Sequence, residues 1–285
     1  MELTVMTATD LTLHCADGVA LQATQYDAQT PLKGALVIGS ALGVPRRIYR
    51  VFSEFLNLQG YSVLAFDYRS SGPQGSDEHL SVSQWGLQDL EAAFQHMLAL
   101  SNGKPVFHLG HSIGGQVAGL ADSLPKIQGM IFVASSFPFW KRWPMPQRIT
   151  MAIMFKLLVP VIAKFTTSFP SKAIGLSADN LPSVLVAEWS RWMGKDDYLL
   201  DPAFGLDNQG YQSRKGPVLA FGFDDDNMVP EASFDKLLSA YPNTDIQRRW
   251  VATRATGPIG HMGFFKNKHK ESLWQECVEW LEVQS

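Results

Sequence analysis

The chain has 285 residues, of which 46% are hydrophobic and 18% are charged, and its formal net charge is −3. This composition is typical of a soluble globular protein with a large core. It excludes the concentrated basic surface that nucleic-acid binding needs.

The two cysteines, Cys15 and Cys277, are too few for a disulfide framework. We therefore expect two free thiols in a reducing compartment, which favours a cytoplasmic protein. The first residues lack the basic and apolar pattern of a secretory signal. No apolar run is long enough to span a bilayer, so we expect no stable membrane insertion.

In chain order, the first half of the sequence alternates predicted strands and helices. Two strands, 11–14 and 19–25, flank Asp17-Gly18, which is a strong hairpin signal. Continuous apolar runs predict buried strands at 34–39, 61–66, 106–109 and 127–134. The spacing of apolar residues predicts helices at 47–59 and 83–100 and another from Ser112. A structural turn is expected at 70–72.

The alternation stops between 135 and 215, and then resumes. The later elements are predicted strands at 217–223 and 246–252 and helices at 231–240 and 268–283. Such alternation predicts one α/β domain, 1–285, with a mostly parallel sheet covered by helices on both faces.

We interpret 135–215 as a helical lid or cap, since ligands bind at the carboxyl edge of such sheets. The alternative is a helical decoration remote from any site. Within this segment, 149–165 predicts an amphipathic or buried helix pair broken at Pro160. A further hypothesis is that this stretch contacts a membrane surface.

Ser112 stands in Gly110-His111-Ser112-Ile113-Gly114, where a predicted strand becomes a helix. Flanking glycines allow the strained turn on which a nucleophilic serine is held. The alternative is a plain helix N-cap. The N–H of Ile113 is the expected oxyanion donor, and the helix N-terminus favours negative charge nearby.

A serine hydroxyl needs a base, and His261 is the best candidate. It lies in the glycine-rich loop 257–263 after the last predicted strand, whereas the alternative is a loop histidine packed by Phe264 and Phe265. His111 should point away from Ser112. The other histidines have no such turn signal: His14, His79, His96, His108 and His269.

A carboxylate usually orients a base histidine, and three acids follow strand 217–223 directly. Asp226 is the preferred residue and Asp225 its close rival. The remaining acids are free to cap the following helix.

These motifs resemble the α/β-hydrolase superfamily of serine hydrolases over nearly the whole chain. In that superfamily the acid often stands in an Asp-x-x-Val-Pro setting, which 226–230 matches, so the resemblance favours Asp226. The stretches 43–50, 66–69 and 260–265 more narrowly resemble a little-characterised bacterial group of predicted esterase-like hydrolases. The resemblance implies the α/β-hydrolase fold and a triad of Ser112, His261 and Asp226.

The oxyanion loop departs from many relatives, which carry His-Gly where this chain has Gly39-Ser40-Ala41-Leu42-Gly43. From its position in the loop, we expect the N–H of Ala41 to be the second oxyanion donor. The N–H of Leu42 is the alternative. The expected substrate contacts are Leu42 of this loop and, because the lid segment is rich in apolar residues, Phe137 and Trp140.

The expected reaction is hydrolysis of a small ester or thioester through an acyl-serine. A peptidase, an acyltransferase and a non-catalytic small-molecule-binding scaffold are the alternatives. No residue spacing indicates a metal site, and no fingerprint of a nucleotide cofactor occurs.

Overall fold

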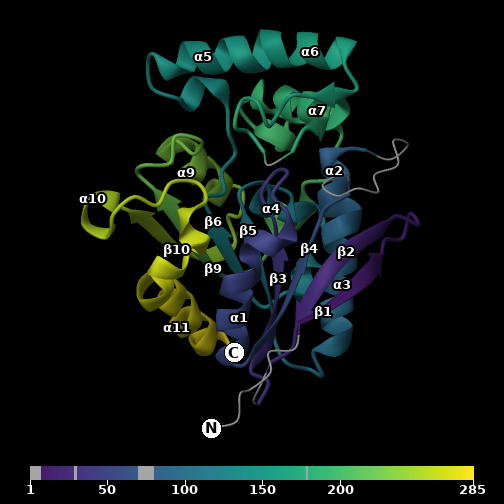
Figure 1. Cartoon of the computed structure of the whole chain (residues 1–285), viewed down its shortest axis with the longest axis vertical. Helices are drawn as coiled ribbons and strands as arrows, with labels where there is room; N and C mark the ends of the chain where they lie inside the picture. Colours follow the sequence, from purple (N-terminus) through teal and green to yellow (C-terminus); the bar gives the residue numbers. More distant parts are fainter. Residues whose placement is uncertain (1–7, 29–30, 70–79, 178) are drawn as a thin grey trace.

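The structure is a computed structural model that describes residues 8–28, 31–69, 80–177 and 179–285. The turn expected at 70–72 and His79 lie outside the described residues. Within them, an eight-stranded sheet has the order β1-β2-β4-β3-β5-β6-β9-β10 (Figure 1). The strands are β1 Ala8–His14, β2 Ala20–Tyr26, β3 Gly34–Gly39, β4 Tyr61–Phe66, β5 Val106–His111, β6 Met130–Val133, β9 Gly216–Phe223 and β10 Thr244–Val251. A separate two-stranded ribbon pairs β7 Ser168–Phe169 with β8 Leu181–Pro182.

The helices follow the strands in the alternation that the sequence predicts. They are α1 Arg50–Leu58, α2 Val82–Gln84, α3 Glu91–Leu100, α4 Ile113–Gln116, α5 Gln147–Ile153, α6 Val159–Phe165, α7 Ser183–Met193, α8 Gln209–Ser213, α9 Glu231–Ser239, α10 Thr253–Thr256 and α11 Gln275–Gln284. A π-helical turn, Trp85–Leu90, joins α2 to α3. The predicted mostly parallel α/β sheet is confirmed, because every pair from β4 to β10 is parallel while β1 and β2 run antiparallel.

Helices cover both faces of the sheet, as two adjacent residues of β5 show. Phe107 packs its ring against Trp280 of α11, with centroids 6.1 Å apart. His108 instead meets Phe94 of α3, at 5.3 Å. Successive side chains of a strand point to opposite faces. Helices α11 and α3 therefore lie on opposite faces of the sheet.

The order of the strands creates a switch point between β3 and β5. The chain passes from β3 to β4 on one side of β3, and then returns to place β5 on its other side. The loops that follow β3 and β5 therefore diverge at the carboxyl edge, where ligands bind in open α/β sheets. Ser112 follows β5 at this edge.

The predicted helix after Ser112 is present, but it is short. Helix α4 covers only Ile113–Gln116 and is followed by a 3₁₀ turn, Ala118–Leu120. Glycines are poor helix formers, and two of the four α4 residues are glycine. The dipole of so short a helix is small, so the sequence-based argument for negative charge beside its N-terminus is weakened.

The predicted break at Pro160 is wrong. Helices α5 and α6 are joined by a π-helical turn, Met154–Leu158, and form one helical run over residues 147–165. Pro160 stands in the first turn of α6, where the π turn has already shifted the hydrogen-bond register. Figure 1 shows this run as one rod above α7.

Residues 134–215 separate β6 from β9, although these two strands are parallel neighbours. No helix in the described part of the chain is long and apolar enough to cross a membrane. Cys15 and Cys277 are both buried and free, as predicted.

Gly114 offers a direct test of how closely β3 meets the turn at Ser112. A Cβ on Gly114 would lie 2.1 Å from the carbonyl oxygen of Gly39. We expect Gly114→Ala to lower the free energy of unfolding by about 3 kcal/mol, measured by urea unfolding. Gly263→Ala is the matched control, since its Cβ would meet Ile259 at an ordinary 3.5 Å. Equal stability of the two variants would contradict the close approach.

Candidate active site

Ser112 occupies a strained turn at the end of β5. Its backbone has φ 52° and ψ −116°, outside the regions that a serine ordinarily adopts. The Ser112 N–H donates to the carbonyl of Val133 at 2.9 Å, and its own carbonyl accepts from Gly115 at 3.1 Å and from the Ser135 hydroxyl. These bonds hold the backbone on both sides, and the partly exposed side chain lines a cavity. This is the geometry of a nucleophile turn.

Asp226, which follows β9, and His261, in the loop after α10, form a pair in which the carboxylate is buried and the imidazole is partly exposed. The Nδ1 of His261 lies 2.7 Å from Oδ2 of Asp226. The other oxygen, Oδ1, accepts the N–H of Met228 at 2.8 Å, which fixes the plane of the carboxylate. Since Nδ1 donates to Asp226, the free nitrogen of the imidazole is Nε2.

The neighbouring acids hold loops and do not contact the imidazole. Asp225 accepts the N–H groups of Ile259 and Gly260 at 2.8 and 2.9 Å. Asp224 accepts the N–H and hydroxyl of Thr253 at 2.9 and 2.6 Å. The expectation that these acids cap the following helix is wrong, because the N-terminus of α9 has no side-chain cap. Asp225 instead positions the loop that carries the histidine.

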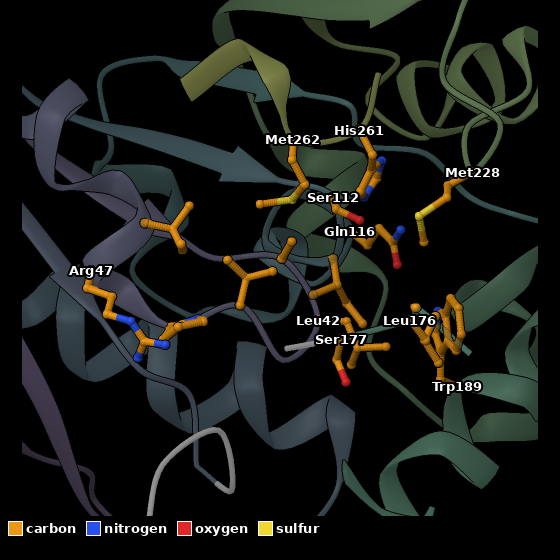
Figure 2. A pocket seen from close by; sticks show the side chains of 16 residues that line it. Leu42, Arg47, Ser112, Gln116, Leu176, Ser177, Trp189, Met228, His261 and Met262 are labelled. Atoms are coloured by element: carbon orange, nitrogen blue, oxygen red, sulfur yellow. The ribbon is translucent and has the colours of Figure 1, made fainter. Parts of the chain in front are cut away.

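Ser112 and His261 line the same cavity, and their side chains lie close to each other in Figure 2. In the described part of the chain, the Ser112 hydroxyl makes no hydrogen bond to the imidazole. Such bonds are often long without substrate and shorten when it binds.

The cavity has two lobes that meet at Ser112 and His261. Their volumes are about 250 and about 240 Å³. The residues common to both are Ser112, Gln116, Gly175, Leu176, Trp189, Met228 and His261. The first lobe adds the loop after β3, including Leu42, and the second adds apolar residues of the helical run 147–165. The amide of Gln116, which sequence reasoning missed as a site residue, is held by the Tyr198 hydroxyl at 2.7 Å.

Two of the three predicted substrate contacts do not line either lobe. Phe137 is fully buried, with its ring 5.2 Å from that of Tyr198. Trp140 is partly exposed, and the ammonium of Lys156 lies over its ring at 4.9 Å. An apolar composition alone does not reveal which way a side chain points, so these two predictions are corrected.

The predicted oxyanion donor Ala41 also needs correction. Its N–H donates to the hydroxyl of Tyr49 at 2.9 Å and is therefore engaged. Within the described residues, no hydrogen bond takes up the N–H of Leu42 or of Ile113. Both residues line the first lobe beside Ser112. The two free N–H groups are thus those of Leu42 and Ile113.

A buried relay connects the loop after β3 with the histidine loop. The Tyr49 hydroxyl lies 2.9 Å from Nδ1 of His111, and Nε2 of His111 lies 2.9 Å from the carbonyl oxygen of His261. Burial lowers the pKa of His111 to about 3, so its ring is neutral. The order of donors is then fixed: Ala41 N–H to Tyr49, Tyr49 O–H to His111, and His111 Nε2–H to His261.

Sequence reasoning missed Tyr49 and treated His111 only as pointing away from Ser112. The available signal was a histidine at the end of a predicted buried strand, since a buried polar group needs partners. Within the described residues, no cluster of three or more His, Cys, Asp or Glu side chains could hold a metal ion.

Tyr49→Phe tests whether the relay positions the site. The variant keeps the ring, which packs 4.7 Å from Phe265, and removes the hydroxyl. We expect kcat on an ester substrate to fall roughly 10- to 100-fold with little change in KM, because the loop after β3 loses the acceptor for Ala41 N–H and His111 loses the donor that orients its ring. Tyr61→Phe is the control, since in the described chain the Tyr61 hydroxyl bonds the hydroxyl of Ser285, and Tyr61 begins β4, at the edge of the sheet opposite the site. A change confined to KM, or equal effects in both variants, would refute the positioning role.

Comparisons with known proteins agree with this architecture. A family model described as "Serine aminopeptidase, S33" matches residues 30–186. A monoglyceride lipase from Saccharomyces cerevisiae is 18% identical, with a TM-score of 0.70 and coverage of 100% of this chain and 98% of that one. A monoacylglycerol lipase from Paleococcus ferrophilus is 21% identical, with a TM-score of 0.60 and coverage of 93% and 99%.

An esterase from Pyrococcus furiosus is 17% identical, with a TM-score of 0.63 and coverage of 98% of this chain and 91% of that one. No curated protein sequence matches the chain. At these identities the solved structures establish the fold, and the family model covers more than half of the chain. The chain therefore belongs to the serine aminopeptidase S33 family of α/β-hydrolases.

Proposed function

We propose that the protein is a serine hydrolase that cleaves carboxylic esters or thioesters through an acyl-Ser112 intermediate. The observation that supports this proposal most strongly is the 2.7 Å pair of Asp226 and His261, which faces the same cavity as the strained Ser112. A nucleophile, a base and an orienting carboxylate are the three groups that acyl transfer requires.

In the proposed first step, the Ser112 oxygen attacks the acyl carbonyl carbon while its proton passes to Nε2 of His261. Asp226 stabilises the imidazolium that forms. Collapse of the tetrahedral intermediate breaks the bond to the alcohol or thiol, which leaves with the proton from His261. Water then attacks the acyl-serine by the same route in reverse, and releases the carboxylic acid and free Ser112.

The oxyanion of the intermediate is proposed to accept hydrogen bonds from the N–H groups of Ile113 and Leu42. These groups come from loops on either side of the switch point, and neither has another partner in the described chain. Removing one such donor typically costs 10²–10³-fold in kcat. This proposal replaces the initial expectation for Ala41.

The lining of the cavity favours an uncharged, apolar ester over a peptide with a free amine. None of the residues that line the two lobes is acidic, and Met154, Phe155 and Val159 form part of the second lobe. An aminopeptidase must bind an ammonium group, which a carboxylate would do best. The lipases and the esterase among the structural relatives are also described as acting on esters.

Residues 135–215 are proposed to act as a lid or cap of a single domain. Their helical run 147–165 forms one wall of the second lobe, so that a substrate chain in this lobe would be shielded from water. As part of the same proposal, the enzyme works in the cytoplasm, where two free thiols are stable.

Labelling with a fluorophosphonate probe tests the proposed nucleophile. We expect the wild-type protein to be labelled, and Ser112→Ala to be unlabelled and at least about 10³-fold slower on p-nitrophenyl butyrate. Alanine p-nitroanilide should be a much poorer substrate, because the cavity offers no acidic group for its amine.

The alternatives have distinct outcomes in the same assay. Faster cleavage of the anilide than of the ester would favour an aminopeptidase. A folded wild-type protein that remains unlabelled, also in mild detergent, would favour a non-catalytic binding scaffold.

The adjacent acids Asp225 and Asp226 form a matched pair for testing the carboxylate. Asp226→Asn should lower kcat about 10⁴-fold, because an amide favours the wrong tautomer of His261. Asp225→Asn should have a smaller effect on kcat, since Asp225 holds only the backbone of the histidine loop. Steady-state kinetics on p-nitrophenyl butyrate separate the two. A larger loss in Asp225→Asn would reverse the assignment.

A further inference from the structure

The helical run 147–165 carries an apolar ridge on its solvent-facing side. The outer ridge consists of every fourth residue: Ile149, Ile153, Leu157, Val161 and Phe165. Their exposed fractions range from 47% for Ile153 to 78% for Phe165. Single exposed apolar side chains are ordinary, whereas a continuous row of five is a feature of interaction surfaces.

The opposite side of the same run is also apolar and faces the cavity. Met151, Phe155 and Val159 line the second lobe. They are offset by two residues from the outer ridge, which places them on the opposite face of a helix with 3.6 residues per turn. A helix that covers a core needs only its inner face to be apolar. Packing among the described residues therefore accounts for the inner face, and none of them covers the outer ridge.

Basic residues flank the outer ridge. Arg148, Lys156 and Lys164 each precede a ridge residue and are exposed. They form no ion pair with any described residue. No Asp or Glu occurs anywhere between 123 and 178, although the whole chain has a net charge of −3. The sequence therefore concentrates positive charge around the one face that presents the ridge.

We propose that the outer ridge docks the protein on an anionic phospholipid surface. The ridge side chains would enter the boundary between headgroups and acyl chains, and the flanking cations would reach the lipid phosphates. Long basic side chains bury their stems and extend their charge to the headgroups in this way. The run is not long and apolar enough to cross a bilayer, so it would lie in the plane of the interface.

The positive charge around the outer ridge favours an anionic lipid surface over a second copy of the chain as its partner. In a symmetric dimer through the outer ridge, the same patch would face itself. The cations of both copies would then meet without an acidic partner, which opposes association. An anionic lipid surface supplies the missing negative charge.

The second lobe also has a solvent-exposed residue at its rim, in the segment that follows the helical run. Ile174 lines the second lobe and is also 49% exposed, so it stands at the rim between cavity and solvent. Resting on the proposed function, this rim is where an apolar ester delivered from the lipid surface would enter the second lobe. The docking itself does not depend on catalysis.

Sedimentation with vesicles tests the docking surface, using the full chain with Ser112→Ala so that hydrolysis plays no part. The vesicles are phosphatidylcholine alone, or phosphatidylcholine with about 30% phosphatidylglycerol. We expect binding to the anionic vesicles that weakens at high salt. Ile153→Ser with Leu157→Ser should lower the partition coefficient at least about tenfold. Lys156→Gln with Lys164→Gln should lower it about 30-fold at low salt.

The control is Leu58→Ser with Leu100→Ser, because these residues are 48% and 47% exposed but lie on α1 and α3. It should bind like the parent protein. With Ser112 restored, the ridge variants should hydrolyse a soluble short-chain ester at the normal rate, so loss of docking is distinguishable from loss of catalysis. Absence of vesicle binding, or equal losses in ridge and control variants, would overturn the proposal. A dimer in solution that the ridge variants dissociate would assign the ridge to a second copy.

Discussion

The site depends on the close approach of two backbone segments, the end of β3 and the turn at Ser112. A Cβ on Gly114 would lie 2.1 Å from the Gly39 carbonyl oxygen, so only hydrogen atoms separate them. A Cβ on Gly110 would likewise lie 2.4 Å from the backbone of Gly115. This contact brings the loop after β3 beside the turn at Ser112, and it holds Ser112 at a positive φ that the residue would not adopt alone.

A second contact makes the loops act as one unit. His111 accepts a hydrogen bond from the Tyr49 hydroxyl and donates one to the backbone carbonyl of His261. The Tyr49 oxygen in turn accepts a hydrogen bond from the N–H of Ala41. The loop after β3 and the histidine loop are more than two hundred residues apart in sequence. Both are thus tied to the end of β5, next to Ser112. Burial keeps His111 neutral, so the pattern of donors stays the same across the working pH range.

The sequence predicts the elements that have one dominant physical cause. Strands 34–39 and 61–66 match the structure, because fully buried strands are continuous apolar runs. The predictions that were wrong concern features that depend on tertiary contacts. Ala41 is engaged by a tyrosine eight residues later, and the burial of Phe137 follows from its neighbours Tyr198 and Tyr211. Pro160 is tolerated because a π turn precedes it, which periodicity does not reveal.

The most direct test of this account is a crystal structure of the protein after reaction with a long-chain alkyl fluorophosphonate. The account predicts phosphorus bonded to the oxygen of Ser112, the phosphoryl oxygen within hydrogen-bond distance of the N–H groups of Ile113 and Leu42, and the alkyl chain in the lobe lined by Met154. Attachment to another residue, or a phosphoryl oxygen turned away from both N–H groups, would contradict it.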